Sequence, residues 1–309
     1  MITVGGFNTS IDKTMEMAEL RSGAVNRATS VAAYAGGKGL HVARAIGILG
    51  EPATLVGVID RAHRALVEDA LSPLGVAFLG IEVESVRTCL TIREAAGARV
   101  TEILEPGPQI DAAAQRALGE AFLSRARESD VAVLSGSVPR GLGEDVYARL
   151  AADLHVRCLV DASGALLRTA VGARPFLIKP NREELEVLVS GAIDGVLAAA
   201  HSARGLCARG IEMVVVSLGA EGALLATGGR VCHAVAPARP AGNTVGSGDC
   251  LLAGIAVGLA RGLATDEVLR LGVACGTANS MSPEHGFVKR EHVDEVLPQV
   301  RVSWLEARA

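Results

Sequence analysis

The sequence has few aromatic side chains and little net charge. Its 309 residues include one Trp, two Tyr and five Phe, and the formal net charge is −4. Surfaces that stack nucleic-acid bases need aromatic rings, and surfaces that bind nucleic acid or anionic lipid need a basic field. The composition therefore predicts no nucleic-acid partner, and it requires that any anionic ligand be held by a local cluster of cations.

Long apolar runs and paired cysteines are also missing. No uninterrupted apolar run reaches the roughly 18–20 residues of a membrane-spanning helix, and residues 1–5 lack the basic start of a signal peptide. The six cysteines are scattered without a Cys-x-x-Cys pair, which favours reduced thiols over a disulfide framework or a zinc site. We therefore expect a soluble, cytoplasmic protein without a membrane partner.

Small and apolar residues are abundant, with half of the chain hydrophobic and 36 glycines. Strand-like runs alternate with helical periods, which predicts a three-layer α/β/α fold around a mainly parallel sheet, with ligands at the carboxyl ends of the strands. Strands are expected at about 2–4, 53–59, 77–83, 131–134, 157–160, 175–178 and 213–217, before a hairpin at 223–226 and 230–236. Helices are expected at about 40–49, 62–71, 111–127, 144–154, 164–172, 194–209, 247–262, 265–279 and 290–299.

Two segments interrupt this order. Residues 9–35 show short alternating pieces without a long helical period, and residues 86–104 alternate on either side of an Ala96-Gly97 turn, as in a β-hairpin. We interpret residues 1–309 as a single domain in which these two segments together form a small sheet, standing off the main sheet as a lid.

The stretch 243–259 carries the strongest chemical signal. A loop with Gly246 and Gly248 leads to one carboxylate, Asp249, and then to an apolar helix. Glycines expose backbone N–H groups, and a helix start adds a partial positive charge, so the stretch resembles an anion cradle with a general base at its edge. The residues alone leave open an ordinary Gly-rich turn capped by Asp249.

Two further groups of residues are ambiguous in the same way. Gly36-Gly-Lys-Gly39 lacks the spacing of a Walker A loop, so Lys38 is either a cation held over a ligand or a solvated lysine. Asp12, in a probable lid strand, either accepts hydrogen bonds from the vicinal hydroxyls of a sugar or is a solvated charge.

Beyond residue 179 the same ambiguity recurs. Asn181 and Glu184, at i and i+3, either hold a hydrated Mg²⁺ through water or mark an acidic helix N-terminus. The Ser217-Leu-Gly219 segment either meets nucleotide phosphates or only turns the chain.

Seven motifs in order resemble the PfkB (ribokinase-like) carbohydrate kinases, and more narrowly their 1-phosphofructokinase and tagatose-6-phosphate kinase branch. The motifs are Asn8-x3-Asp12, Gly36-Gly-Lys-Gly39, Leu134-Ser-Gly-Ser137, Asp161-x-Ser163, Leu177-Ile-Lys-Pro-Asn-x-Glu-Glu184, Val216-Ser-Leu-Gly219 and Thr244-Val-Gly-Ser-Gly-Asp249. The match runs nearly end to end. It implies a ribokinase-like fold and ATP-dependent phosphorylation of a sugar phosphate with Mg²⁺.

The resemblance also implies roles for individual residues. Asp249 would be the general base, and the amides of Gly246, Ser247 and Gly248 would bind the migrating phosphoryl group. The acceptor would be held by Asp12, Gly37 and Ser137, with Lys38 and Arg87 on its existing phosphate. The nucleotide side would comprise Lys179, Ser217, Gly219 and Asn279, and Asn181 and Glu184 would organise Mg²⁺ through water.

Two residues depart from the branch on its sugar-reading side. His41 and Cys89 stand where the branch usually has Asn, and imidazole and thiol differ from an amide in hydrogen-bond capacity. We therefore expect a ketohexose phosphate such as fructose 1-phosphate or tagatose 6-phosphate, with an unphosphorylated sugar, a nucleoside or another polyol as the alternative. A non-catalytic sugar-phosphate sensor is a further alternative. Because an isolated small sheet exposes its edges, the lid is also a candidate homodimer contact.

Overall fold

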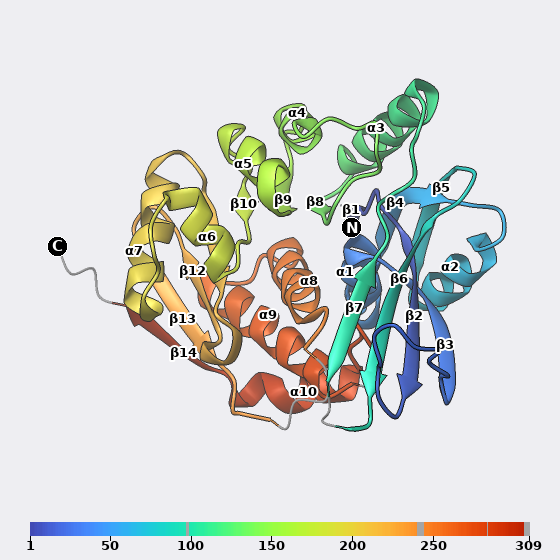
Figure 1. Cartoon of the computed structure of the whole chain (residues 1–309). Coiled ribbons are helices and arrows are strands. Elements are labelled where there is room, and N and C mark those ends of the chain that lie inside the picture. The colour runs from blue at the N-terminus through green and yellow to red at the C-terminus, as the bar shows by residue number, and fades with distance from the viewer. Residues whose placement is uncertain (97–98, 240–243, 283, 306–309) are drawn as a thin grey trace.

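The computed structural model describes residues 1–96, 99–239, 244–282 and 284–305. Two sheets organise them (Figure 1), and the larger has ten strands in the order β14-β13-β12-β11-β10-β9-β8-β1-β4-β5. Its parallel part comprises β1 (Ile2–Gly5), β4 (Ala53–Ile59), β5 (Val76–Glu82), β8 (Val131–Ser135), β9 (Arg157–Asp161), β10 (Leu177–Ile178) and β11 (Met213–Ser217). The antiparallel end comprises β12 (Ala223–Ala226), β13 (Val231–Val235) and β14 (Arg301–Leu305).

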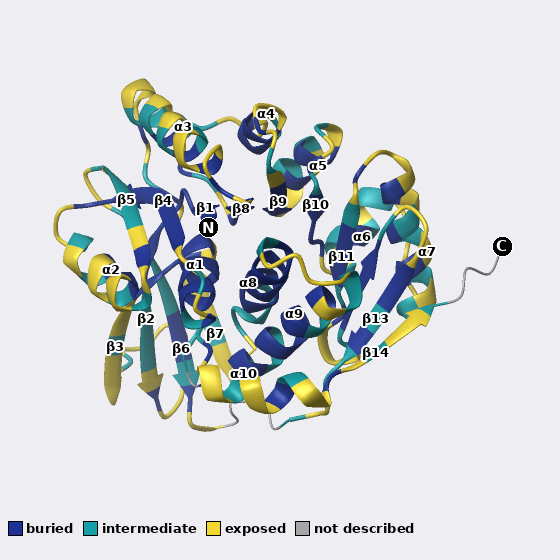
Figure 2. Ribbon diagram, turned by 180° about the vertical axis from the view of Figure 1, so that it is seen from behind, coloured by how far each residue is buried: buried dark blue, intermediate teal, exposed yellow. Residues whose placement is uncertain are grey.

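Helices cover both faces of this sheet and form two hydrophobic cores. One core includes residues of α1 (Lys38–Ile48), α2 (Arg64–Leu71), α8 (Ser247–Ala260), α9 (Thr265–Ser280) and α10 (Arg290–Val296). The other includes residues of α3 (Ala112–Ala126), α4 (Val146–Ala152), α5 (Gly164–Gly172), α6 (Arg182–Val189) and α7 (Gly195–Ala208). Figure 2 shows the buried residues concentrated in the central strands and in the helix sides that face them. The expected three-layer architecture is confirmed.

The central strands are apolar throughout because both of their faces are buried. In β8, Val131 and Val133 belong to one core, whereas Ala132 and Leu134 belong to the other. Side chains alternate between the faces of a strand, so a strand covered on both sides needs apolar residues at every position. This requirement explains the continuous apolar runs from which the parallel strands were predicted.

The second sheet has four strands in the order β3-β2-β6-β7. These strands are β2 (Ser10–Met17), β3 (Ser30–Gly36), β6 (Arg87–Glu94) and β7 (Val100–Leu104). β2 pairs with β6 in parallel, and the other two pairs are antiparallel. The two sequence segments expected to form a small sheet therefore do so, although residues 97–98 of the predicted turn lie outside the described residues. The action of this sheet as a lid stays a prediction.

The structure differs from the expected elements near the C-terminal end of the described chain. β14 was not predicted, because it is a short edge strand with few buried residues. The expected helix at 290–299 ends at Val296 and continues as a 3₁₀ turn, Leu297–Gln299, which contains Pro298. No helix in the described part of the chain is long and apolar enough to cross a membrane.

Candidate active site

The Gly-rich loop forms the N-terminus of α8, next to the carboxyl ends of the parallel strands. Gly246 is the N-cap with φ of 82°, and a Cβ there would lie 2.4 Å from the backbone of Gly286, so glycine is required for both backbone and space. Ser247, Gly248 and Asp249 form the first turn, and Asp249 is 4% exposed. The amide of Ser247 donates to the carbonyl of Thr244 over 3.2 Å. Residue 243, which opens the predicted stretch, lies outside the described residues.

Asn279 supports this loop from beneath. Its side-chain amide donates to the carbonyl of Val245 and to Oγ of Ser247, both over 3.0 Å, and its Oδ1 accepts from the amide of Phe287 over 3.0 Å. Asn279 is fully buried and is not among the residues that line the neighbouring cavity. Asn279 therefore supports the loop through Val245 and Ser247, and its expected contact with the nucleotide stays a prediction.

Asp249 is connected to Asp12 through His41. Nδ1 of His41 lies 2.9 Å from Oδ2 of Asp249, and Nε2 lies 3.4 Å from Oδ2 of Asp12. Burial lowers the pKa of His41, but the contacts with Asp12 and Asp249 outweigh burial and raise it to about 8. His41 thus links Asp249, the candidate general base, to Asp12, the candidate sugar-binding residue. His41 is also one of the two positions at which the sequence differs from the 1-phosphofructokinase and tagatose-6-phosphate kinase branch.

Two of the residues predicted to bind the sugar, Asp12 and Cys89, lie on β2 and β6. Oγ of Ser10 donates to Oδ1 of Asp12 over 2.7 Å, and Cys89 is the direct cross-strand partner of Asp12. Burial opposes ionisation of Asp12, but the contacts with His41 and Ser10 leave its pKa below the ordinary value. Burial raises the pKa of the Cys89 thiol. Asp12 is therefore a charged acceptor beside a neutral thiol.

Of the other residues predicted to bind the acceptor, Gly37 is buried, Arg87 is half-buried and Ser137 is exposed. Nε of Arg87 donates to the carbonyl of Asn8 over 3.4 Å, and Nδ2 of Asn8 donates to Oγ of the exposed Ser137 over 2.9 Å. Gly37 is the N-cap of α1 with φ of 100°. Asn8 was part of a quoted motif without an assigned role, and the structure shows it joining β1 to the loop after β8.

Two lysines converge on a buried carboxylate that had been assigned no role, Asp161. Nζ of Lys179 lies 3.3 Å and Nζ of Lys38 lies 3.9 Å from Oδ1 of Asp161, which is 1% exposed. Asp161 raises the pKa of Lys38, so this lysine is charged. A Cβ on Gly248 would lie 3.4 Å from Nζ of Lys179. Both ammonium groups are therefore near the Gly-rich loop, and the position of Asp161 at the end of β9 was the available sequence signal.

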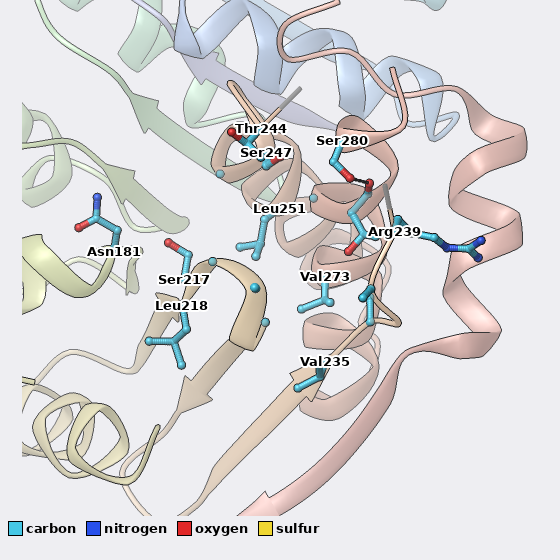
Figure 3. A pocket seen from close by; sticks show the side chains of 18 of the residues that line it. Asn181, Ser217, Leu218, Val235, Arg239, Thr244, Ser247, Leu251, Val273 and Ser280 are labelled. Atoms are coloured by element: carbon cyan, nitrogen blue, oxygen red, sulfur yellow. Dashed lines mark hydrogen bonds between the residues drawn. The ribbon is translucent and has the colours of Figure 1, made fainter. Parts of the chain in front are cut away.

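A cavity of about 760 Å³ lies against the Gly-rich loop at the start of α8. Its polar side chains include Asn181, Ser217 and Ser247, and its apolar wall includes Val235, Leu251 and Val273. Gly219 and Gly248 also line it. In Figure 3, Ser247 lies at one end of the cavity, and Leu251, Val273 and Val235 extend away from it. Mostly apolar cavities with a few placed polar groups are typical small-molecule sites.

Asn181 and Glu184 form a capping box at the start of α6. Oδ1 of Asn181 accepts from the amide of Glu184 over 2.8 Å, and Oε2 of Glu184 accepts from the amide of Asn181 over 2.9 Å. Oε1 of Glu184 also accepts from Oγ of Ser163 over 2.7 Å. The helix-terminus interpretation therefore holds. Within the described residues, no group of three or more His, Cys, Asp or Glu is arranged to hold a metal ion.

The large, mostly parallel sheet with a small separate sheet is the fold of the ribokinase-like kinases. The chain belongs to the pfkB family of carbohydrate kinases, whose family model matches residues 6–284. It is thus a sugar kinase that phosphorylates a hydroxyl group, and the suspected family is confirmed.

The most informative relatives act on two different sugar phosphates, according to their names. The tagatose-6-phosphate kinase of Staphylococcus epidermidis is 32% identical over 310 residues, which cover 98% of this chain and 99% of that protein. The 1-phosphofructokinase of Bacillus subtilis is 32% identical over 308 residues, which cover 99% of this chain and all of that protein. A crystal structure of phosphofructokinase-2 from Escherichia coli with substrates and products has 26% identity and a TM-score of 0.90, with coverage of 96% and 98%.

Proposed function

We propose that the protein transfers the γ-phosphoryl group of ATP to a hydroxyl of a phosphorylated ketohexose, of the fructose 1-phosphate or tagatose 6-phosphate type. One observation carries this proposal: Asp249 is buried in the first turn of α8, directly after two residues that line the cavity, and His41 links it to the carboxylate of Asp12. The names of the 32%-identical relatives support the same acceptor class.

In the proposed reaction, Asp249 takes the proton of the acceptor hydroxyl as that oxygen attacks the γ-phosphorus. The N-terminus of α8 stabilises the charge on the migrating group through its amides and its dipole. Lys38 and Lys179 supply positive charge beside the loop, held in place by Asp161. Phosphoryl transfer depends mainly on alignment and on neutralisation of charge, and these residues serve both needs.

The residues present fit Mg²⁺ only through water. Both carboxylate oxygens of Glu184 already accept a hydrogen bond, from Asn181 and Ser163, but each keeps a further lone pair for a metal-bound water. When bound, Mg²⁺ would neutralise charge on the phosphates of ATP. Ser217 and Gly219 would contact the nucleotide from the opposite wall of the cavity.

The existing phosphate of the acceptor would be held chiefly by Arg87. Lys38, the other cation expected there, contacts Asp161 over 3.9 Å and would add positive charge from the start of α1. Asp12, Gly37 and Ser137 would hold the sugar hydroxyls and position the ring.

A second candidate function is the phosphorylation of a different acceptor. It is favoured by His41, which fills the space between Asp12 and Asp249 with an imidazole, and by the thiol of Cys89 beside Asp12. Such a change in polar groups alters which hydroxyls the site accepts, because unpaired buried polar groups reject mismatched substrates.

We also propose a homodimer through the second sheet and a cytoplasmic location. Apolar side chains exposed on this sheet are Val31, Tyr34, Val100, Ile103 and Leu104. Exposed apolar groups gathered on one small sheet favour contact with another chain. The phosphofructokinase-2 of Escherichia coli is a tetramer in its inhibited form, which shows that self-association occurs among the structural neighbours.

An acceptor panel tests the function directly. Turnover with ATP and Mg²⁺ is measured with fructose 1-phosphate, tagatose 6-phosphate, fructose, tagatose and a nucleoside. The proposal expects the highest kcat/KM for a ketohexose phosphate. Activity confined to an unphosphorylated acceptor would replace the proposal with the second candidate, and ATP turnover with none of them would restore the non-catalytic sensor.

A further inference from the structure

His41 makes the connection between the two halves of the site. It belongs to α1, while its two carboxylate partners come from β2 of the second sheet and from α8 of the main body. The shorter contact, 2.9 Å, is with Asp249, and the longer one, 3.4 Å, is with Asp12. One buried ring therefore ties the acceptor-binding sheet to the helix that carries the base.

The ring is also fixed by its packing. His41 is 5% exposed, and a Cβ on Gly286 would lie 2.1 Å from Cγ of the imidazole. Gly286 has φ of 55° and donates its amide to the carbonyl of Val245, in the Gly-rich loop, over 3.3 Å. Because the backbone at Gly286 lies directly against the ring, His41 has little freedom to turn away from the carboxylates.

We propose that His41 is a positioning residue that holds Asp249 through Oδ2 and links its orientation to Asp12. This inference rests on the proposed function, since it takes Asp249 as the base. Oδ1 of Asp249 has no hydrogen-bond partner among the described residues, so it is the oxygen left for the acceptor. The acceptor proton passes to Oδ1 as the new O–P bond forms and the γ-phosphorus separates from the ADP oxygen, while His41 keeps its own protons.

The charged groups around the ring favour its protonated form. Asp12 and Asp249 face it from β2 and α8, and Arg44, on the next turn of α1, is paired with Glu284 over 3.7 Å. His285 faces the same space, and burial together with Arg93 lowers its pKa. His285 therefore loses its proton at a lower pH than His41 does.

The direction of the pH dependence follows from these charges. The pKa of His41 is about 8 in the folded protein, above the ordinary histidine value of 6.5. The bridging charge is therefore complete below about pH 6.5 and is lost as the pH rises through about 8. A neutral imidazole has one N–H and can donate to only one of the two carboxylates. We expect kcat/KM to fall as the pH rises through about 8.

Three substitutions test the proposal. His41→Ala should lower kcat by about tenfold to hundredfold, since a small misplacement of a reacting group has effects of this order, and should leave KM for ATP unchanged. His41→Asn, which keeps one amide donor, should recover part of kcat and lose the inflection near pH 8. His201→Asn, on an exposed position of α7, is the matched control and should behave as the wild type.

A packing role would give a different pattern. It would lower the melting temperature of the His41 variants but leave kcat per folded enzyme and the pH profile unchanged, and that result overturns the proposal. If His41→Ala does not fold, His41→Asn carries the same test. Asp249→Asn separates the two proposals: near wild-type kcat in that variant refutes the base, whereas an inactive Asp249→Asn with unaffected His41 variants refutes only the positioning role.

NMR titration of the His41 ring supplies a readout that needs no turnover. In the wild type the ring should titrate near pH 8, and in Asp249→Asn and Asp12→Asn its pKa should move toward 6.5, because each variant removes one negative partner. A ring that titrates near 6.5 in the wild type and is unaffected by both substitutions would also overturn the proposal.

Discussion

The proposed nucleotide side and the proposed sugar side of this site differ in the polarity of the side chains that line them. On the nucleotide side, a cavity of about 760 Å³ is lined largely by small and apolar residues next to the Gly-rich loop. On the sugar side, the carboxylate of Asp12 already contacts Ser10 and His41 within the protein. We infer that the proposed nucleotide side places few polar demands on its ligand. On the proposed sugar side, an acceptor must replace or fit around the contacts that Asp12 makes with Ser10 and His41.

The largest expected effect on kcat is at Asp249, which lies between the proposed nucleotide side and the proposed sugar side. Asp249→Asn should lower kcat by about 10³-fold, within the range typical of general bases, with both KM values changed by less than about threefold. Steady-state kinetics with the best acceptor of the panel measure this. Asp145→Asn, an exposed acid paired with Arg149 over 3.1 Å, is the control. A kcat close to that of the wild type in Asp249→Asn would show that Asp249 is not the general base.

A smaller effect should be confined to the sugar side. Arg87→Ala should raise KM for a phosphorylated acceptor by about tenfold to hundredfold, because a hydrogen bond to a charged group contributes about 1.5–3 kcal/mol. KM for ATP should not change, and neither should KM for an unphosphorylated analogue. Arg61→Ala, whose side chain is 90% exposed, is the matched control. An equal rise in both KM values would contradict the separation of the two sides.

The sequence predicts the fold and the Gly-rich loop better than it predicts contacts between distant residues. Alternating strands and helices, and a Gly-rich loop before an apolar helix, are local patterns that can be read along the chain. The His41–Asp249 contact joins residues 208 positions apart. No local sequence pattern predicts a contact between residues so far apart in the chain. The support that Asn279 gives to Val245 and Ser247 has no local signature either, since it depends on how α9 packs against the loop. Asp161 was visible only as a carboxylate at a strand end.

A substitution in the wall of the cavity should change KM for ATP without changing KM for the acceptor. Thr277, half-buried on α9, lines the cavity, and Thr277→Trp should raise KM for ATP by about tenfold, since inserting a large side chain costs about 1–3 kcal/mol. KM for the acceptor should be unaffected. Leu197→Trp on α7, at a position 69% exposed, controls for the added ring. An unchanged KM for ATP would remove the cavity from the proposed nucleotide site.

The smallest effect is expected at the thiol beside Asp12. Cys89→Ser keeps the size of the side chain but adds a better hydrogen-bond donor and acceptor. One additional hydrogen bond contributes about 0.5–1.5 kcal/mol, so KM for a sugar acceptor should fall by about twofold to fivefold while KM for ATP stays constant. Cys89→Ala is the matched variant and should leave KM for the acceptor within about twofold of the wild type. If the Ser and Ala variants behave identically, the position does not contact the acceptor, and specificity on the sugar side would depend on Asp12 and His41 instead.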